Sequence, residues 1–316
     1  MGPTAAVAGT VVVEQRRTVA DGVVELTLAR PGGGRLPDWA PGAHVDLVLP
    51  DGTVRQYSLC GDRWDPLRYR VAVQHEPDGR GGSRILHEGV RVGDVLGLGG
   101  PRNTFRLAPA AEYLFVAGGI GITPLLPMLH QAELLGLPWR LLYLGRSRAR
   151  MAYLDELAAY GERVTVHAGD EAGRVVLDGW RPADPAVRVW ACGPARLLDA
   201  VAAWGAAPGG FAPRIERFTA APDAGATATS FDAVAARSGV RVTVEPHESL
   251  ATALARGGVR VVTSCAQGVC GTCETDVLEG DPDHRDSLLD DEERRAGHCL
   301  FPCVSRSRSD VLVLDL

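Results

Sequence analysis

The sequence predicts a multidomain α/β protein, and three observations support this fold class. The first third of the chain alternates short apolar strands with turns, and the second third alternates strands with helices. Five of the seven cysteines lie in the last fifth of the chain. A chain of 316 residues is long enough for two or three domains that each bury a core. We expect domains at residues 1–109, 110–218 and 230–316, with a linker at 219–229.

The first segment has the pattern of a small antiparallel β-barrel. Its candidate strands alternate apolar and polar residues or are rich in β-branched ones, and Gly or Pro separates them. Several short strands at this spacing are typical of a barrel. The expected strands are 9–15, 23–28, 45–49, 54–59 and 69–74.

The second segment alternates two kinds of element, and this order predicts a parallel sheet with helices on its faces. Ligands of such sheets bind at the carboxyl ends of the strands. We expect strands at 113–117, 140–144, 164–167 and 188–191, and helices at 124–135, 153–159 and 195–203.

The third segment follows a stretch of small and polar residues, TAAPDAGATAT at 219–229, which is typical of a flexible linker. Strands are expected around Phe231 and at 240–244, and a short helix at 249–256. A cysteine-containing loop comes next, and a last strand is expected at 311–315.

Charge and hydropathy exclude several classes of function. The formal net charge is −6, and residues 230–316 hold 15 acidic and 9 basic side chains, so this segment accounts for the whole imbalance. Nucleic-acid binding is disfavoured because phosphate contacts need a basic surface. An acidic segment suits docking of a basic partner, and an acidic face that only aids solubility explains it equally well. Without a membrane span or signal peptide, we expect a cytoplasmic protein.

The strongest motif is Cys265-x4-Cys270-x2-Cys273, with Cys303 after 29 intervening residues. This is the spacing of thiolates that hold a plant-type [2Fe–2S] cluster, whereas zinc sites usually show paired short CxxC or CxxH units. Gly268 and Gly271 let the loop fold over a cluster and direct amide hydrogens at its sulfides.

Cys299 lies four positions before Cys303 and leaves a choice of ligand. If it replaced Cys303, the gap after Cys273 would shrink to 25 residues. It is a spare thiol near the cluster or a packing residue, and packing is the better interpretation because free cysteines are often buried.

A flavin site is indicated by Arg55-Gln56-Tyr57-Ser58 on a barrel strand. The motif supplies a cation for a phosphate, an aromatic ring for the isoalloxazine and a hydroxyl for the reactive ring nitrogen. Gly81-Gly82-Ser83 precedes a helical run at 84–87 and forms a suitable phosphate cradle. A surface strand that carries Arg and Tyr by chance is the alternative explanation.

A nucleotide site is indicated by a glycine-rich turn between a buried strand and a helix. Glycines permit close backbone approach, and a helix N-terminus favours a pyrophosphate. The turn is not GxGxxG, and glycine-rich turns are often structural. Cys192-Gly193-Pro194 ends another strand, where a buried structural cysteine is the alternative. The residues predicted in the turn are Gly118, Gly119, Ile120, Gly121 and Thr123.

With these motifs in place, the cysteine loop resembles that of plant-type ferredoxins, and the rest resembles the ferredoxin-reductase superfamily. The order flavin, nucleotide, cluster is similar to that of the phthalate dioxygenase reductase and vanillate demethylase reductase family over nearly the whole chain. This resemblance implies FMN, a [2Fe–2S] cluster and NADH. It also implies a flavin-binding barrel at 1–109, an NAD-binding domain at 110–218 and a β-grasp ferredoxin domain at 230–316.

The same resemblance implies roles for individual residues. It places Cys192 near the nicotinamide ring and Phe218, in Glu216-Arg217-Phe218, against the flavin face. Thr123 can also reach the FMN phosphate, and Val73 completes the predicted cofactor-binding set.

Nucleotide preference is the less defined part of the site. Arg146 and Arg148 follow the strand at 140–144, where an adenine ribose would lie. They could bind a 2′-phosphate or remain solvated, and the family resemblance favours NADH.

The expected function is electron transfer from NADH through FMN and the cluster to a terminal oxygenase, with a Rieske-type partner favoured. A reductase for a haem monooxygenase is the alternative within this class. A cluster-based redox sensor and a zinc-bearing binding module are alternatives from other classes. Ser58, Cys192 and Phe218 are the candidate catalytic residues, and they position the reactants rather than transfer protons.

Overall fold

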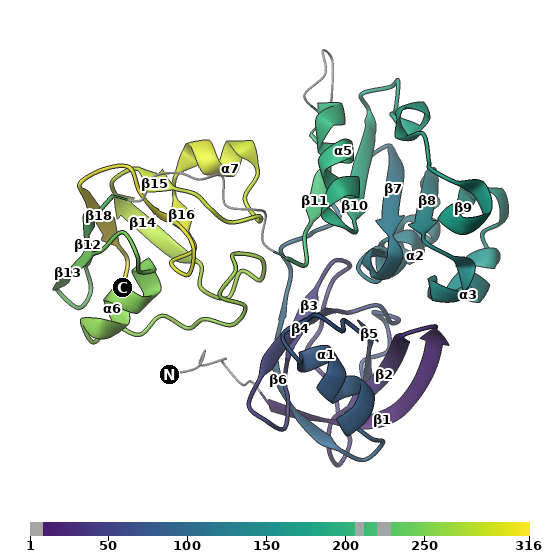
Figure 1. Cartoon of the computed structure of the whole chain (residues 1–316), viewed down its shortest axis with the longest axis horizontal. Coiled ribbons are helices and arrows are strands. Elements are labelled where there is room, and N and C mark those ends of the chain that lie inside the picture. Colours follow the sequence, from purple (N-terminus) through teal and green to yellow (C-terminus); the bar gives the residue numbers. More distant parts are fainter. Residues whose placement is uncertain (1–8, 206–211, 220–228) are drawn as a thin grey trace. The chain divides into compact units, whose positions relative to one another are not determined.

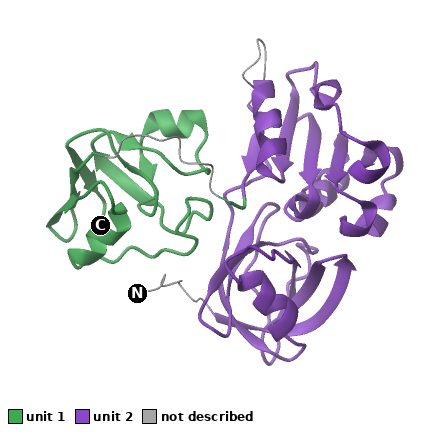
Figure 2. Cartoon of the chain, in the orientation of Figure 1, with its two compact units in different colours: residues 1–6, 218–316 green, residues 7–217 purple. Residues whose placement is uncertain are grey.

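The computed structural model describes residues 9–205, 212–219 and 229–316. These residues form two compact units, a larger unit within residues 7–217 and a smaller unit from residue 218 to the C-terminus (Figure 2). The boundary predicted at 109/110 lies inside the larger unit, so it stays a prediction. The predicted linker at 219–229 falls almost wholly outside the described residues.

A six-stranded antiparallel barrel forms the first half of the larger unit (Figure 1). Its strand order is β4-β3-β6-β1-β2-β5, and a bridge between Leu59 and Val71 joins the two ends of this sheet. The apolar side chains that alternate along the strands fill the interior. The strands are β1 (Gly9–Ala20), β2 (Val23–Ala29), β3 (His44–Val48), β4 (Val54–Ser58), β5 (Arg68–Gln74) and β6 (Val95–Arg102).

Strand β6 was not predicted from the sequence. Its sequence VLGLGGPR contains glycines and a proline, which are poor strand formers. The structure explains one of these glycines. A Cβ atom at Gly97 would lie 2.8 Å from the Cβ of Val48 on β3, so a side chain would push the two strands apart.

A helical segment follows β5. The helix α1 (Gly82–Arg84) continues directly into a π-helical turn at Ile85–Gly89. The helical run expected at 84–87 is therefore present, and Gly81 precedes it with a φ of 84°, a left-handed conformation that suits glycine.

The second half of the larger unit is a five-stranded parallel sheet with the order β11-β10-β7-β8-β9. Helices cover both of its faces, as the sequence predicts (Figure 1). The strands are β7 (Glu112–Gly118), β8 (Trp139–Gly145), β9 (Val164–Ala168), β10 (Val187–Cys192) and β11 (Arg214–Glu216). The helices are α2 (Leu126–Leu134), α3 (Leu154–Ala158), α4 (Gly169–Ala172) and α5 (Ala195–Gly205).

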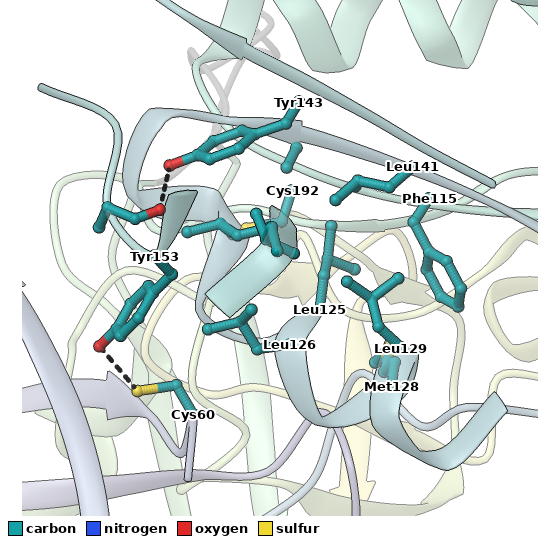
Figure 3. Close-up of a cluster of buried hydrophobic side chains, with 14 of the residues drawn as sticks. Cys60, Phe115, Leu125, Leu126, Met128, Leu129, Leu141, Tyr143, Tyr153 and Cys192 are labelled. Carbon is teal, nitrogen blue, oxygen red and sulfur yellow. Dashed lines mark hydrogen bonds between the residues drawn. The ribbon is translucent and has the colours of Figure 1, made fainter. Parts of the chain in front are cut away.

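One apolar cluster joins the barrel to the parallel sheet. It contains Phe115 and Tyr143 of the sheet and Leu129 of α2, together with Val23 and Cys60 of the barrel (Figure 3). Burying apolar area is the main favourable contribution to such packing. The barrel and the sheet are therefore held together by a shared core.

The smaller unit contains a five-stranded mixed sheet with the order β13-β12-β18-β14-β16, in which only β12 and β18 pair in parallel among the described strands. Helix α6 (Leu250–Arg256) packs on it and is capped by the Ser249 hydroxyl, which accepts from the amide of Thr252. The sheet strands are β12 (Phe231–Ala235), β13 (Val240–Val244), β14 (Thr275–Glu279), β16 (Cys299–Leu300) and β18 (Val311–Leu314). A separate ribbon pairs β15 (Pro282–Asp283) with β17 (Arg306–Ser307).

Helix α7 (Asp291–Ala296) was not expected, although its start carries a recognisable signal. The Asp290 side chain accepts from the amides of Glu292 and Glu293, and Glu293 accepts in return from the Asp290 amide. This reciprocal capping box is visible in the sequence as Asp290-x-x-Glu293.

Membrane insertion finds no support in the helices. Among the residues that the structure describes, every helix is too short or too polar to cross a bilayer.

Candidate functional site

The cysteine loop lies between α6 and β14 in the smaller unit. Cys265, Cys270 and Cys273 are buried, and Cys303, which follows β16, is partly buried. The Cys265 thiol interacts with those of Cys270 and Cys303, and Cys303 also interacts with Cys273. The fold thus gathers the four predicted ligands from two distant segments.

The loop backbone has the shape that an iron–sulfur cluster needs. Ala266, Gly268 and Gly271 have positive φ angles of 54°, 66° and 71°, which turn the chain back over the thiols. A Cβ atom at Gly268 would lie 2.6 Å from Cγ2 of Val304 and 3.0 Å from Cα of Asp286, so glycine is required there for two independent reasons.

Polar groups around the thiols point towards sulfur. The Gln267 amide donates to Cys265 Sγ at 3.3 Å, and the Gly268 amide donates to Cys303. The Thr272 hydroxyl lies 3.1 Å from Cys270 Sγ. Amides aimed at sulfur stabilise negative charge on cluster ligands, so the residues present fit a [2Fe–2S] cluster.

In the described part of the chain, no group of three or more Cys, His, Asp or Glu side chains is arranged to share one metal ion. Two thiolates per iron is the pattern of a two-iron cluster.

Two of the four thiols, those of Cys270 and Cys303, have a raised pKa. The hydrogen bond with Cys265 and then burial raise the pKa of Cys270. For Cys303, the hydrogen bond with Cys265 lowers the pKa, but Cys273 and burial outweigh it and raise the pKa to about 12. Metal binding must therefore displace these protons.

Cys299 lies beside this group on β16, where it pairs with Asp276 of β14. It is partly buried, and burial followed by the charges of Glu274 and Asp276 raises its pKa to about 11. Neutral packing is consistent with this environment, and the four-cysteine ligand set remains a prediction.

A polar network lies behind the cluster loop and was not predicted from the sequence. Asp286 Oδ1 accepts from the amides of Leu288 and Leu289, and the Arg294 guanidinium donates to the Asp286 carbonyl at 2.6 Å. The next amide, that of Ser287, donates to the Gly268 carbonyl at 2.9 Å. Helix α7 thus braces the loop through Arg294.

The two halves of the predicted flavin site meet in the barrel. Arg55 on β4 donates to the Arg80 carbonyl at 2.8 Å, and a Cβ atom at Gly82 would lie 2.6 Å from Arg55 Cγ and Nε. This contact joins segments that are 25 residues apart. A guanidinium packed against Gly82 fits a phosphate group.

Not every predicted flavin residue lies on the same face. Arg55 and Tyr57 alternate with Gln56 along β4, and Gln56 donates to the buried Asp46 at 2.7 Å. Asp46 also pairs with Arg102 at 2.7 Å. The Gln56 side chain therefore supports the strand from the opposite face.

Other members of the predicted flavin set have partners within the protein. Ser58 is buried at the end of β4, and the Ser83 hydroxyl accepts from the Glu76 amide at 3.1 Å. The Val73 side chain lies in the barrel core, and its carbonyl contacts His87 Nε2 at 2.9 Å. Thr123 is buried and donates to the Ile120 carbonyl at 3.0 Å.

The two predicted nucleotide loops interlock at the carboxyl ends of β7 and β10. A Cβ atom at Gly121 would lie 2.2 Å from the Cys192 carbonyl oxygen, and one at Gly118 would lie 2.6 Å from Cδ of Pro194. Conversely, a Cβ atom at Gly193 would lie 2.9 Å from the Gly118 backbone. Only glycines let the two loops approach this closely.

The candidate ribose-binding arginines follow β8 and are both exposed. Arg148 Nε pairs with Glu171 Oε2 at 2.9 Å, and the Arg146 carbonyl accepts from the Asp170 amide at 3.0 Å. The acidic start of α4 therefore lies beside these arginines.

A buried carboxyl group beside Cys192 was not assigned a role in the sequence analysis. Cys192 Sγ lies 3.8 Å from Glu216 Oε2, where β10 and β11 end together. Burial raises the pKa of Glu216 to about 8 and raises that of Cys192 well above its usual value, with the Glu216 charge as a further cause for Cys192. Both groups are therefore neutral at pH 7. Phe218, two residues later, is 41% exposed.

Comparisons with known proteins agree with this geometry. The family model of the 2Fe-2S iron-sulfur cluster binding domain matches residues 234–308. The phenoxybenzoate dioxygenase subunit beta of Ectopseudomonas oleovorans is 44% identical over 94% of each chain. The solved structure of phthalate dioxygenase reductase, described as a modular structure for electron transfer from pyridine nucleotides to [2Fe–2S], is 35% identical with a TM-score of 0.69 over 97% of each chain.

A third relative is much longer than this chain. An intact type IV self-sufficient cytochrome P450 monooxygenase is 39% identical, with a TM-score of 0.92 over 98% of this chain. This chain spans 41% of that protein.

Substitution of Gly121 tests the interlocked loops. Gly121→Ala should lower the free energy of unfolding by roughly 1–3 kcal/mol, because the added methyl group overlaps the Cys192 carbonyl. Chemical denaturation measures the change. Gly179→Ala is the matched control, since its Cβ atom would meet nothing within 4 Å. Equal effects of the two substitutions would show that the loops are not tightly interlocked.

Substitution of Glu216 tests its buried carboxyl group. The folded pKa is raised, so wild-type stability should fall as pH rises from about 4.5 to about 8, while the unfolded chain ionises first. Glu216→Gln should remove this decline, and its stability relative to wild type should improve by up to about 4 kcal/mol between pH 4.5 and pH 8. Urea denaturation at both pH values measures this. The exposed Glu162→Gln serves as control, and a constant difference for Glu216→Gln would contradict the assignment.

Proposed function

The chain belongs to the phthalate dioxygenase reductase family, and from this premise we propose that it carries electrons from NADH, through bound FMN and a [2Fe–2S] cluster, to a partner oxygenase. The observation that carries the proposal is the meeting of four thiols in a folded loop whose amides point at sulfur. A cluster held by these thiols would pass electrons on one at a time.

Cys265, Cys270, Cys273 and Cys303 would hold the cluster. A plant-type cluster accepts and releases one electron at a time. The protein shields three of the ligands from solvent and supplies amide hydrogens from Gln267 and Gly268. Both effects adjust the potential of the cluster.

FMN would be held in the barrel, with Arg55 and the Gly81–Gly82 turn at its phosphate and Tyr57 against its ring system. FMN accepts two electrons from a nicotinamide and can release them singly. By strand alternation Ser58 shares the face of Gln56, so its proposed contact with the reactive ring nitrogen would be made from the end of β4. Phe218 would cover the flavin face until the nicotinamide replaces it.

NADH would bind at the interlocked loops, whose glycines permit close approach of a pyrophosphate to the backbone. Cys192 and Glu216 are both neutral, so neither places a charge next to the nicotinamide. Their proposed role is to orient the nicotinamide and to exclude water from it. Hydride transfer needs no general acid or base, and none is assigned.

The ion pair at the start of α4 supports NADH over NADPH. Glu171 neutralises Arg148, which would otherwise be available for a 2′-phosphate. The acidic side chains of Asp170 and Glu171 would also repel that phosphate.

A Rieske-type oxygenase is the proposed partner, and the names of relatives as components of dioxygenase systems support an oxygenase partner. The similarity to 41% of a self-sufficient P450 monooxygenase favours a haem monooxygenase as the second candidate. A cytoplasmic location is part of the proposal, since NADH and unpaired cysteines belong to a reducing compartment.

The decisive test uses anaerobically purified protein. Its absorption spectrum is recorded, its iron, acid-labile sulfide and extracted flavin are measured, and it is then titrated with NADH. We expect flavin and cluster bands that both bleach with NADH, and NADH-dependent reduction of cytochrome c. A coloured protein that NADH does not reduce would instead indicate a redox sensor, and a colourless protein a zinc-bearing module.

Two serine substitutions test the ligand set. Cys303→Ser should lose most iron and sulfide and lower NADH–cytochrome c reduction at least about tenfold, because a ligand is removed. Reduction of ferricyanide directly from the flavin should persist. The matched control is Cys299→Ser, which should keep its iron, and loss of the cluster in this variant would reassign the fourth ligand.

Substitution of Glu171 tests nucleotide preference. Glu171→Gln frees Arg148 and removes a negative charge, so the ratio of kcat/KM for NADPH to that for NADH should rise roughly 3- to 10-fold. Steady-state kinetics with ferricyanide measures the ratio. Glu162→Gln, at an exposed site of the same sheet domain, should leave it unchanged. No change for Glu171→Gln would place the 2′-position elsewhere.

A further inference from the structure

We infer that Tyr153, Cys60 and Tyr143 form a hydrogen-bonded tie that sets the position of the nucleotide loop relative to the flavin strand, which makes Tyr153 a positioning residue for hydride transfer. The inference rests on the proposed function and deepens it. Nothing in the motifs of the sequence points to these three residues.

The tie begins in the barrel, at the place where the sheet closes. Cys60 lies two residues beyond Ser58, and its amide donates to the Arg70 carbonyl at 2.9 Å beside the Leu59–Val71 bridge. Its buried thiol lies 3.4 Å from the hydroxyl of Tyr153, which belongs to the parallel-sheet half (Figure 3). This contact crosses from one half of the larger unit to the other.

Tyr153 is held in an unfavourable conformation to make this contact. Its φ is 65°, and Ala266 of the cluster loop is the only other non-glycine residue with a positive φ in the described part of the chain. A left-handed tyrosine persists only where its surroundings determine it, and such strain concentrates at functional sites.

The Arg70 side chain fixes the same contact from a second direction. Its guanidinium carbon lies 5.2 Å from the centre of the Tyr153 ring, and it donates to the Cys60 carbonyl at 2.6 Å. It also pairs with Glu156 of α3 at 3.1 Å and with Glu25 of β2 at 3.5 Å. Tyr153 is thus clamped between its hydroxyl contact and a cation over its ring.

The tie continues to the nucleotide loop through Tyr143. The Tyr143 hydroxyl lies 3.2 Å from the carbonyl of Ala152, the residue before Tyr153. It also lies 3.2 Å from the Gly119 carbonyl. One hydroxyl hydrogen is shared between these acceptors. Gly119 belongs to the glycine turn that would bind the nucleotide, so a continuous path links that turn to Cys60, two residues after the flavin strand.

All members of this path are buried and neutral. Burial raises the pKa of Cys60 to about 11 and raises those of Tyr143 and Tyr153, so each keeps its proton at neutral pH. Water cannot replace a lost bond easily in this apolar cluster. Removal of one hydroxyl should therefore shift the loop rather than be compensated by solvent.

The test measures flavin reduction by NADH in single-turnover experiments on the intact protein. Tyr153→Phe should slow this step about 3- to 30-fold, since small misplacements of reacting atoms have large effects on rate. The primary isotope effect with NADH deuterated at the transferred position should change. The dissociation constant for NADH and the flavin content should stay within about twofold.

Four further variants separate positioning from stability. Cys60→Ala should reproduce the effect of Tyr153→Phe, and the double variant should be no slower than either single one, because both remove the same bond. Cys60→Ser, which keeps a hydrogen-bonding group, should recover part of the rate. Tyr160→Phe is the matched control, because the Tyr160 ring packs edge-on against Trp139 in the same half.

The outcomes distinguish the inference from the proposed function. If wild-type protein shows no flavin reduction by NADH, the proposed function fails. If wild-type protein is reduced but Tyr153→Phe and Cys60→Ala keep its rate and isotope effect, the tie has no positioning role. Additive losses in the double variant, or losses matched by a lower unfolding midpoint alone, would also overturn the inference.

Discussion

The close approach of two backbone loops is the constraint on which the larger unit depends. Gly118 and Gly121 meet the 192–194 loop at distances that no side chain would permit. The carboxyl ends of β7 and β10 therefore form one continuous surface of peptide groups. Such a surface lets a pyrophosphate lie against the backbone, and it needs a rigid sheet beneath it, which the parallel pairing and the shared apolar cluster provide.

In the smaller unit, glycines likewise let the backbone approach closely, here to the cysteine sulfur atoms. Its loop turns sharply at Ala266, Gly268 and Gly271, and Gly268 fits only because it has no side chain. In both units backbone amides would supplement the side chains that bind a cofactor, and amides carry no side-chain entropy cost when they are ordered. The protein thus positions its cofactors partly through the path of the chain.

Most of the fold follows from the sequence pattern, because long apolar and alternating segments determine strands and helices. The exceptions have physical causes. Strand β6 is rich in glycine, which weakens the pattern but is required at Gly97 by the close approach of Val48. Helix α7 has no apolar stripe, and only its capping box at Asp290 marks it.

The residues of the candidate site also fall into those that the sequence reveals and those that it does not. The cysteines and glycines are recognisable because their chemistry or backbone conformation is specific to the task. Gln56 was grouped with Arg55 by adjacency, although strand alternation turns it towards Asp46. Glu216 and Tyr153 could not be found from local sequence, since each acts through a partner that is distant along the chain.

The hydrogen bonds by which Arg294, Asp286 and Ser287 brace the cluster loop have a consequence for protein that loses its cluster in an aerobic cell. Arg294, Asp286 and Ser287 hold the loop through hydrogen bonds between protein groups, and these bonds do not themselves require iron. A polypeptide that loses its cluster to oxidants would keep a receptor ready for the assembly machinery. Repair then requires insertion of iron and sulfide, with little refolding, and the damaged molecule need not be degraded.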